Sequence, residues 1–391
     1  MSVTADFPVQ AHPGRASAPR PRPPFRAEHV GSLLRPAGLQ AARALAAKGE
    51  IPHARLQAVE DAAIAEAVAF QQSLGLRSIT DGEFRRAYFH LDFLSQIEGM
   101  QTYRDETVAH FRTAGGTVLD FSPPRLRVTG TLARTRPIMR RDYEVLAAAV
   151  AGEGVARVTI PSPSMAYRGG RAAVDPEAYP DIEGFFADLA RVFREEIADL
   201  ADAGCRYLQL DDTNLAYLCD HDMREGVRRT GEDPDLLPAT YAALINDALA
   251  GAPDDMATAI HLCRGNFRSA FVAEGGYDPV AEVLFNQIDV DAFFLEYDDE
   301  RSGSFTPLRF VPKDKVVVLG VVSSKIPRLE SKDEVMRRID EAARVLPLEQ
   351  LCLSPQCGFS STEHGNDLSF DDQRRKLELV VEVAREVWGE A

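Results

Sequence analysis

The stretch FFADLARVFREEIADLADAGCRYLQLDD, residues 185–212, joins a helix to a strand and decides the fold. Before Gly204, apolar residues recur at the spacing of one helical face: Phe186, Leu189, Phe193, Ile197 and Leu200. Glycine often follows a helix C-terminus, because it adopts the left-handed conformation without strain. The run YLQLDD then predicts a buried strand with an acidic end at Asp211.

The same alternation of helix and strand recurs along the chain. A second helical pattern ends before Gly75 and contains Leu56, Val59, Ala63, Ala67 and Phe70. Short apolar runs that predict eight strands end at Ser32, Asp81, Ser162, Asp211, Cys263, Glu296, Ser323 and Cys357. This alternation predicts an α/β fold, a (β/α)8 TIM barrel. An open doubly wound sheet would usually carry a GxGxxG turn after its first strand, which this sequence lacks.

Residues 88–135 do not fit the alternation. They contain FLSQIEGM, a polar stretch around Gly115 and Gly116, and RLRVTGTLA, which together predict a β-hairpin inserted after the second strand. Such a hairpin would form a lid or rim. Residues 25–391 are expected to form one catalytic TIM-barrel domain, and residues 1–24, rich in Pro, Ala and Arg, are expected to be a disordered tail.

Composition limits the classes of function. The chain has 391 residues, 45% hydrophobic and 27% charged, which is typical of a globular protein. A net charge of −16 disfavours nucleic acid or an anionic membrane as a partner. No apolar run approaches the roughly 20 residues that cross a bilayer, and no signal-peptide core is visible, so a cytoplasmic location is expected. The five cysteines indicate thiols and metal ligands rather than disulfides.

Four residues at predicted strand ends have the chemistry of a metal site. In AIHLCRGNF, residues 259–267, His261 and Cys263 are two positions apart, so a strand presents both on the same side. Glu296 ends the run AFFLE, and Cys357 follows LCLSPQ. Imidazole, thiolate and carboxylate are ligands of tetrahedral Zn²⁺, so these residues predict a zinc site. A single buried cysteine or histidine is more often part of the core, to which we assign Cys205, Cys219 and Cys352.

Further polar residues gather at the strand ends, where barrel enzymes have their active sites. They are Ser32, Asp81, Glu83, Ser162, Ser164, Gln209, Asp211, Asp212, Ser323 and Lys325. Asp212 precedes Thr213 and Asn214, so it either caps a helix or faces the site. The acidic run at residues 298–300 indicates a solvated loop.

Seven motifs together resemble the C-terminal catalytic barrel of cobalamin-independent methionine synthase, in the short single-domain branch of that family. They are HVGSLLRP, ITDGEFRR, YLQLDD, HLCRGNF, FFLEYDDERSG, GVVSSKIPRLES and LSPQCGFSSTEHGN, in the family's order over residues 25–385. The resemblance implies a zinc-dependent methyltransferase that methylates the thiol of homocysteine to form methionine. It places zinc on His261, Cys263, Glu296 and Cys357. It places the amino-acid part of homocysteine against Ser32, Glu83 and Asp211.

The residue types suit that reaction. Zinc acts as a Lewis acid that favours the thiolate form of a bound thiol. Two thiolates and one carboxylate exceed the charge of the dication, so the incoming sulfur would stay nucleophilic. Glu83 and Asp211 would hold the substrate ammonium, and backbone N–H groups near Gly31 and Ser32 would hold its carboxylate. The alternative is that the two carboxylates only cap neighbouring helices or pair with Arg85 or Arg86.

The sequence defines the methyl donor less well. Long family members hold a tryptophan near the pterin, whereas the only Trp here is Trp388, near the C-terminus. A catalytic histidine of those enzymes falls at Lys325. A methyltetrahydrofolate, a methylated corrinoid and another methyl compound all stay open as donors, and a homo-oligomer is compatible with the sequence.

Two other functions stay open. One is a zinc-dependent alkyltransferase or lyase acting on another thiol, such as coenzyme M. The other is a hydrolytic or non-catalytic zinc barrel, which the thiolate-rich ligand set disfavours.

Overall fold

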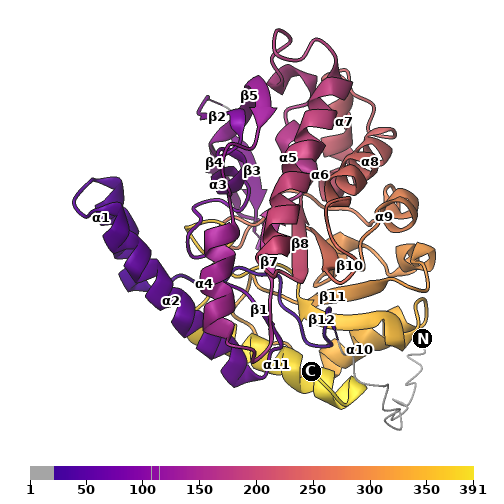
Figure 1. Cartoon of the computed structure of the whole chain (residues 1–391). Helices are drawn as coiled ribbons and strands as arrows, with labels where there is room; N and C mark the ends of the chain where they lie inside the picture. The colour runs from indigo at the N-terminus through magenta and orange to yellow at the C-terminus, as the bar shows by residue number, and fades with distance from the viewer. Residues whose placement is uncertain (1–21, 107, 114) are drawn as a thin grey trace.

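Six parallel strands form the central sheet of this α/β protein (Figure 1). The structure is a computed structural model that describes residues 22–391 except Thr107 and Ala114. The strands follow one another across the sheet in sequence order: β7 (Val158–Pro161), β8 (Tyr207–Asp212), β9 (Ala257–Leu262), β10 (Ala292–Glu296), β11 (Val316–Val322) and β12 (Leu351–Pro355). A shorter parallel pair, β1 (Ser78–Ile79) and β6 (Val155–Ala156), precedes them. The prediction of an α/β fold around a parallel sheet is confirmed.

The strands are buried and aligned at their ends. Every residue of the six strands is buried, as expected for parallel strands that are covered on both faces. The register pairs Asp211 of β8 with His261 of β9, and His261 with Phe294 of β10. Side chains from the carboxyl ends of neighbouring strands therefore meet at one edge of the sheet.

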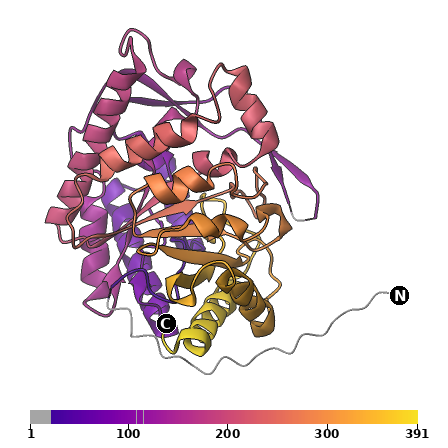
Figure 2. The ribbon, with the colours of Figure 1, turned by 90° about the vertical axis from the view of Figure 1, so that its right-hand side faces the viewer.

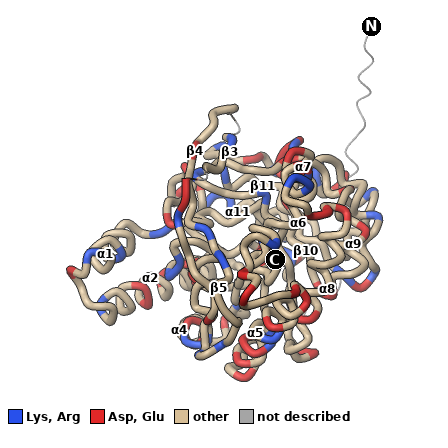
Figure 3. Tube along the Cα trace, turned by 90° about the horizontal axis from the view of Figure 1, so that it is seen from above, with Lys and Arg blue, Asp and Glu red and all other residues tan. Residues whose placement is uncertain are grey.

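Helices lie around the outside of these strands (Figures 1 and 2). They are α1 (Ala37–Ala47), α2 (His53–Leu74), α3 (Leu91–Leu94), α4 (Arg140–Val150), α5 (Ile182–Asp202), α6 (Asn214–Tyr217), α7 (His221–Arg229), α8 (Leu237–Leu249), α9 (Ala281–Gln287), α10 (Lys332–Ala343) and α11 (Phe370–Trp388). Both predicted helical patterns are confirmed: Gly75 ends α2 with φ 87°, and Gly204 follows α5 with φ 99°. Seen from above, α1 and part of α2 project from one side (Figure 3).

Two antiparallel strand pairs occupy the segment between β1 and α4. β2 (Glu98–Tyr103) pairs with β5 (Arg125–Ala133), and β3 (Ala109–Arg112) pairs with β4 (Val118–Phe121). Arg112 and Phe271 exchange backbone hydrogen bonds of 2.7 and 2.8 Å, and the rings of Phe121 and Phe267 stack with centroids 4.1 Å apart. The pair β3–β4 therefore rests on the loop that follows β9. Across the described residues, none of the helices combines the length and the apolar character needed to span a bilayer.

The first predicted strand, ending at Ser32, is not a regular strand in the structure. An isolated parallel bridge joins Ala27 to Leu353 of β12. Gly31 then departs from extended pairing with φ 147°, and a Cβ on Gly31 would lie 2.9 Å from Glu83 Oε1. The backbone therefore departs from strand geometry at a glycine beside the Glu83 carboxylate, where a side chain would be too close. Of the expected tail, residues 1–21 lie outside the described residues, and residues 23–24 are buried.

Candidate metal centre and substrate cavity

The four predicted metal ligands converge at the carboxyl ends of β9, β10 and β12. His261 lies in β9 and Cys263 directly follows it, Glu296 ends β10, and Cys357 comes two residues after β12. All four side chains are buried, and their ligand atoms lie within 4.8 Å of one another. The two sulfur atoms are 3.5 Å apart. The cluster therefore offers the number and the types of donor atoms of a tetrahedral zinc site.

His261 presents a ring nitrogen to this cluster. Its Nδ1 lies 3.3 Å from the carbonyl oxygen of Phe294 on β10. Among the described residues, its buried Nε2 has no nitrogen or oxygen partner, and the ring contacts the Cys357 sulfur. Histidine ligands of metals commonly donate their other N–H to a carbonyl. The orientation of His261 thus fits a bound metal ion.

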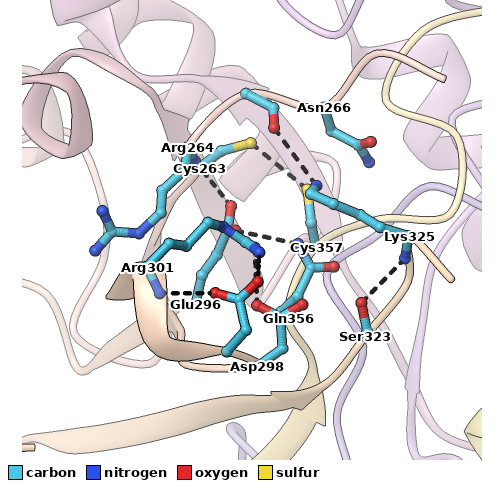
Figure 4. Close-up of polar contacts among 12 residues, drawn as sticks. Cys263, Arg264, Asn266, Glu296, Asp298, Arg301, Ser323, Lys325, Gln356 and Cys357 are labelled. Atoms are coloured by element: carbon cyan, nitrogen blue, oxygen red, sulfur yellow. Dashed lines mark hydrogen bonds and ion pairs between the residues drawn. The ribbon is translucent and has the colours of Figure 1, made fainter. Parts of the chain in front are cut away.

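Glu296 is oriented by three donors, which Figure 4 shows around its carboxylate. Oε1 accepts the backbone N–H of Arg264 at 2.8 Å, and Oε2 accepts Nε2 of Gln356 at 3.1 Å and Nη2 of Arg301 at 3.3 Å. Burial acts to raise the pKa of Glu296, but Lys325 and Arg301 outweigh burial and lower this pKa to about 2. Glu296 therefore stays anionic at neutral pH.

The pKa values of the two thiols in the cluster are shifted in opposite directions. The hydrogen bond with Cys263 lowers the pKa of Cys357 well below its ordinary value, and the same contact raises the pKa of Cys263. One sulfur is thus stabilised as a thiolate and the other as its hydrogen-bond donor. A dication would favour the thiolate form of both.

A small cavity beside the ligand cluster brings the predicted substrate residues together. It is lined by Val30, Ser32, Glu83, Phe89, Asp211, His261, Cys263, Cys357, Gly358 and Ser361. These include all three predicted substrate-binding residues and three of the four predicted metal ligands. The cavity therefore joins the two halves of the predicted site.

Glu83 and Asp211 bring two carboxyl groups into this cavity. Burial raises the pKa of Glu83 to about 7, which Arg86 opposes and Asp211 reinforces. Burial likewise raises the pKa of Asp211 to about 6. Arg86 lies 3.6 Å from Glu83 Oε2, and Gln209 Nε2 donates to Asp211 Oδ1 at 2.7 Å. One guanidinium thus faces two carboxylates, and a bound ammonium would stabilise both.

The backbone around the cavity is unusual at two positions. Glu83 has φ 59°, which is rare for a residue with a Cβ and is often found at functional sites. At Gly358, a Cβ would collide with Oγ of Ser32, so glycine lets the segment after Cys357 approach this serine. Ser32 Oγ also accepts the backbone N–H of Ser360 at 3.2 Å. Ser32 therefore has a structural contact besides its place at the cavity.

Other candidate residues serve the structure. Asp212 accepts the backbone N–H of Leu215 at 2.7 Å, so of its two alternatives the capping one is confirmed. The expectation of a solvated loop at residues 298–300 is wrong for Asp298, whose side chain is 2% exposed and pairs with Arg301 at 2.8 Å. Charge alone predicts solvation, but an arginine three positions later satisfies this carboxylate. The three cysteines assigned to the core are free and buried: Cys205, Cys219 and Cys352.

Three residues that orient the predicted metal ligands do not follow from the sequence patterns. Arg264 follows Cys263, Gln356 precedes Cys357, and Arg301 lies on the loop after Glu296. Their nearness to ligands in the sequence was the available signal, because groups that hydrogen-bond metal ligands often orient them. Side-chain direction, which a pattern does not show, decides which neighbours do so.

A parallel α/β fold with thiols, an imidazole and carboxylates converging at its strand ends defines an α/β enzyme with a metal-type site beside a polar cavity. Residues 25–386 match the family described as cobalamin-independent synthase, catalytic domain. The chain belongs to this family. It is a methionine synthase-like catalytic domain, an enzyme of the methyltransferase class.

Relatives cover nearly the whole chain. The uncharacterized protein YxjH of Bacillus subtilis (strain 168) is 44% identical over 376 residues, 96% of this chain and 98% of that protein. The methionine synthase of Pyrococcus abyssi is 27% identical over 336 residues, 84% of this chain and 85% of that protein. A solved structure of a candidate vitamin-B12 independent methionine synthase from Listeria monocytogenes is 37% identical, with a TM-score of 0.75 and coverage of 94% and 99% of the two chains. The family predicted from the seven motifs is thereby confirmed.

Proposed function

We propose that this enzyme transfers a methyl group to the thiol of homocysteine, forming methionine, with zinc as its metal. The proposal rests on one observation: the same cavity is lined by residues of a thiolate-rich ligand cluster and by two carboxylates. Soft anionic ligands suit a metal that binds sulfur, and a carboxylate pair suits the ammonium of an amino acid.

Four side chains would hold the zinc ion: His261, Cys263, Glu296 and Cys357. Bound zinc would supply Lewis acidity, which favours the thiolate form of the substrate at neutral pH. The protein's own part is to fix the ligands. The Phe294 carbonyl orients the His261 ring, and three donors from separate segments hold the carboxylate of Glu296.

The remaining cavity residues would orient the substrate. Glu83 and Asp211 would accept hydrogen bonds from the ammonium, while Ser32 and the backbone near Gly31 would contact the substrate carboxylate. With its amino-acid part fixed in this way, the substrate would direct its sulfur toward Cys263 and Cys357. Holding the sulfur in line with the methyl donor would then supply much of the rate enhancement.

The acceptor and the donor are separate parts of the proposal. For the acceptor, coenzyme M is the alternative thiol, but its sulfonate would meet Glu83 and Asp211 as a like charge. The carboxylate pair therefore favours homocysteine. For the donor we propose a methyltetrahydrofolate-type compound, which fits the family, with a methylated corrinoid as the second donor to test.

We also infer that the sheet closes into a (β/α)8 barrel and that residues 88–135 form an inserted hairpin. Supporting closure, the Glu28 N–H donates to the Leu353 carbonyl at 2.8 Å, and the Leu353 N–H donates to the Arg26 carbonyl at 2.9 Å. On the other side, the Arg157 N–H donates to the Ile79 carbonyl at 2.8 Å. Contact between α11 and α2 supports a closed ring of helices, and the pairs β2–β5 and β3–β4 support the hairpin.

Methionine formation tests the proposed reaction. Zinc-loaded protein is incubated with homocysteine or coenzyme M and one donor at a time, methyltetrahydrofolate or methylcobalamin. The methylated thiol is measured by mass spectrometry. We expect methionine with one donor, and none with the Cys263→Ser variant as the matched control. Methylation of coenzyme M in place of homocysteine would contradict the proposed acceptor.

A further inference from the structure

Among the described residues, the buried Lys325 ammonium has one hydrogen-bond partner, a backbone carbonyl. Its side chain is 4% exposed and follows β11, at the same end of the sheet as the metal ligands. Within the described part of the chain, Nζ donates one hydrogen bond, to the Gly265 carbonyl at 3.5 Å, and forms no ion pair with a carboxylate. An ammonium group has three donors, and burying its charge without an anion is unfavourable. The surroundings of Lys325 should therefore contain a compensating anion.

The anions that Lys325 faces belong to the ligand cluster. Figure 4 shows its side chain running toward Cys357 and the loop of Gly265. After the hydrogen bond from Cys263, burial and the hydrogen bond from His261, Lys325 also lowers the pKa of Cys357, and it is the strongest of the groups that lower the pKa of Glu296. Lys325 is thus a charged neighbour of the sulfur ligands.

Other cations near the cluster already have partners or point elsewhere. Arg301 pairs with Asp298 at 2.8 Å and with Glu296 at 3.3 Å, and Arg86 lies 3.6 Å from Glu83. The guanidinium of Arg264 points away from the two sulfurs (Figure 4) and lies 4.5 Å from the ring centroid of Tyr277. Lys325 is left as the cation that faces the sulfur side of the site.

The charge at this site depends on the chemical state of the ligand sulfur. Two thiolates and a carboxylate would exceed the charge of one divalent ion by a single negative charge. Arg301 contacts the carboxylate at 3.3 Å, and Lys325 is the cation on the sulfur side. A substrate thiolate adds another negative charge, whereas a methylated thioether adds none. We propose that Lys325 is a specificity-determining residue that favours the anionic thiol substrate over the neutral thioether product. Lys325 thereby helps the site to release its product, an inference that rests on the proposed function.

Binding of homocysteine and methionine to zinc-loaded protein tests this role by calorimetry. Lys325→Met keeps the apolar stem and removes the charge, and Lys325→Arg keeps the charge. We expect Lys325→Met to weaken homocysteine binding about tenfold to a hundredfold and to change methionine binding by less than about twofold. Lys325→Arg should retain most of the preference for the thiol. Equal weakening of both ligands, or no change in either, would overturn the assignment.

A second ligand pair separates this inference from the proposed function. Coenzyme M and its methyl thioether make the same thiol–thioether comparison without the amino-acid part. If the wild type does not bind homocysteine, the proposed acceptor is wrong, and the second pair still decides the role of Lys325. Loss of the thiol preference in Lys325→Met supports that role, and an unchanged preference contradicts it. Zinc content and unfolding temperature confirm that each variant is folded and loaded.

Discussion

Buried polar clusters lie at both ends of the parallel strands, and they are built on opposite principles. At the amino end, Glu28 and Arg157 pair at 2.9 Å with both side chains fully buried, and the Tyr207 hydroxyl donates to Glu28 at 3.3 Å. At the carboxyl end, acidic groups outnumber the cations beside them: two thiols and Glu296 with Arg301 at 3.3 Å from Glu296, and Glu83 and Asp211 with Arg86 at 3.6 Å from Glu83. Opposite charges satisfy each other, whereas like charges need a ligand of the other sign. The first cluster therefore stabilises the fold, and the second is suited to bind.

Among the changes that test this comparison, removing a ligand sulfur should have the largest effect, which is a loss of bound zinc. Cys263→Ser or Cys357→Ser should reduce zinc from about one ion per chain to nearly none, because each change removes a soft anionic ligand. Metal content after dialysis against a weak chelator measures this. Cys205→Ser is the matched control, since this buried thiol lies outside the cluster and should leave zinc bound. Full zinc content in both cluster variants would contradict the metal site.

Breaking the opposite-charge cluster should affect stability rather than metal binding. Arg157→Met leaves Glu28 as an unpaired buried charge and should lower the free energy of unfolding by about 3 to 5 kcal/mol. Zinc content per folded chain should stay the same. Urea unfolding measures the loss, and Arg191→Met, at an ion pair whose side chains are 40% and 41% exposed, serves as the control. A loss no larger than in the control would show that the pair does not stabilise the fold.

A smaller effect should appear in the pH dependence of methionine binding, because a thioether does not titrate. The pKa values of about 7 for Glu83 and about 6 for Asp211 mean that both carboxylates are charged above this range and protonated below it. Affinity for the methionine ammonium should therefore fall as the pH falls from 8 to 5, by about tenfold for one lost charged contact.

The contribution of Glu83 to the stability of the ligand-free protein should change in the opposite direction from the affinity for methionine: it should rise as the pH falls. Its pKa in the folded state is raised above the ordinary value, so the folded state binds this proton more tightly than the unfolded state does. Protonation of Glu83 therefore adds stability as the pH falls through about 7. For the preceding prediction, calorimetry at several pH values measures the affinity for methionine. An affinity that does not change with pH would argue against the carboxylate pair.

The residues that form the candidate metal site could be predicted because strand geometry is regular. The period of a strand puts His261 and Cys263 on the same side, and parallel strands align Glu296 and Cys357 at the same edge. The surroundings of Lys325 depend on the path of a loop sixty positions away, at Gly265, which no local period describes.

The fold shows the same limit. The helices before Gly75 and Gly204 follow from apolar spacing and a C-terminal glycine, and both occur where expected. The strand expected to end at Ser32 forms only an isolated bridge at Ala27, and Gly31 lies beside Glu83, a contact between segments far apart in the sequence. Apolar patterns predict which residues are buried, but they do not show where a distant side chain changes the backbone.

The most direct test is whether the ligand cluster and the pair Glu83 and Asp211 both act on one amino-acid thiol. Calorimetry compares homocysteine with its desamino analogue 4-mercaptobutyrate on wild-type protein, with zinc and after zinc removal, and on Asp211→Asn. We predict that zinc-loaded wild type binds homocysteine about tenfold to a hundredfold more tightly than the analogue, from charge-assisted hydrogen bonds to the ammonium. Asp211→Asn should remove most of this preference, and zinc removal should weaken both thiols. Equal affinity of the loaded wild type for the two thiols would contradict the homocysteine assignment and favour another thiol as the substrate.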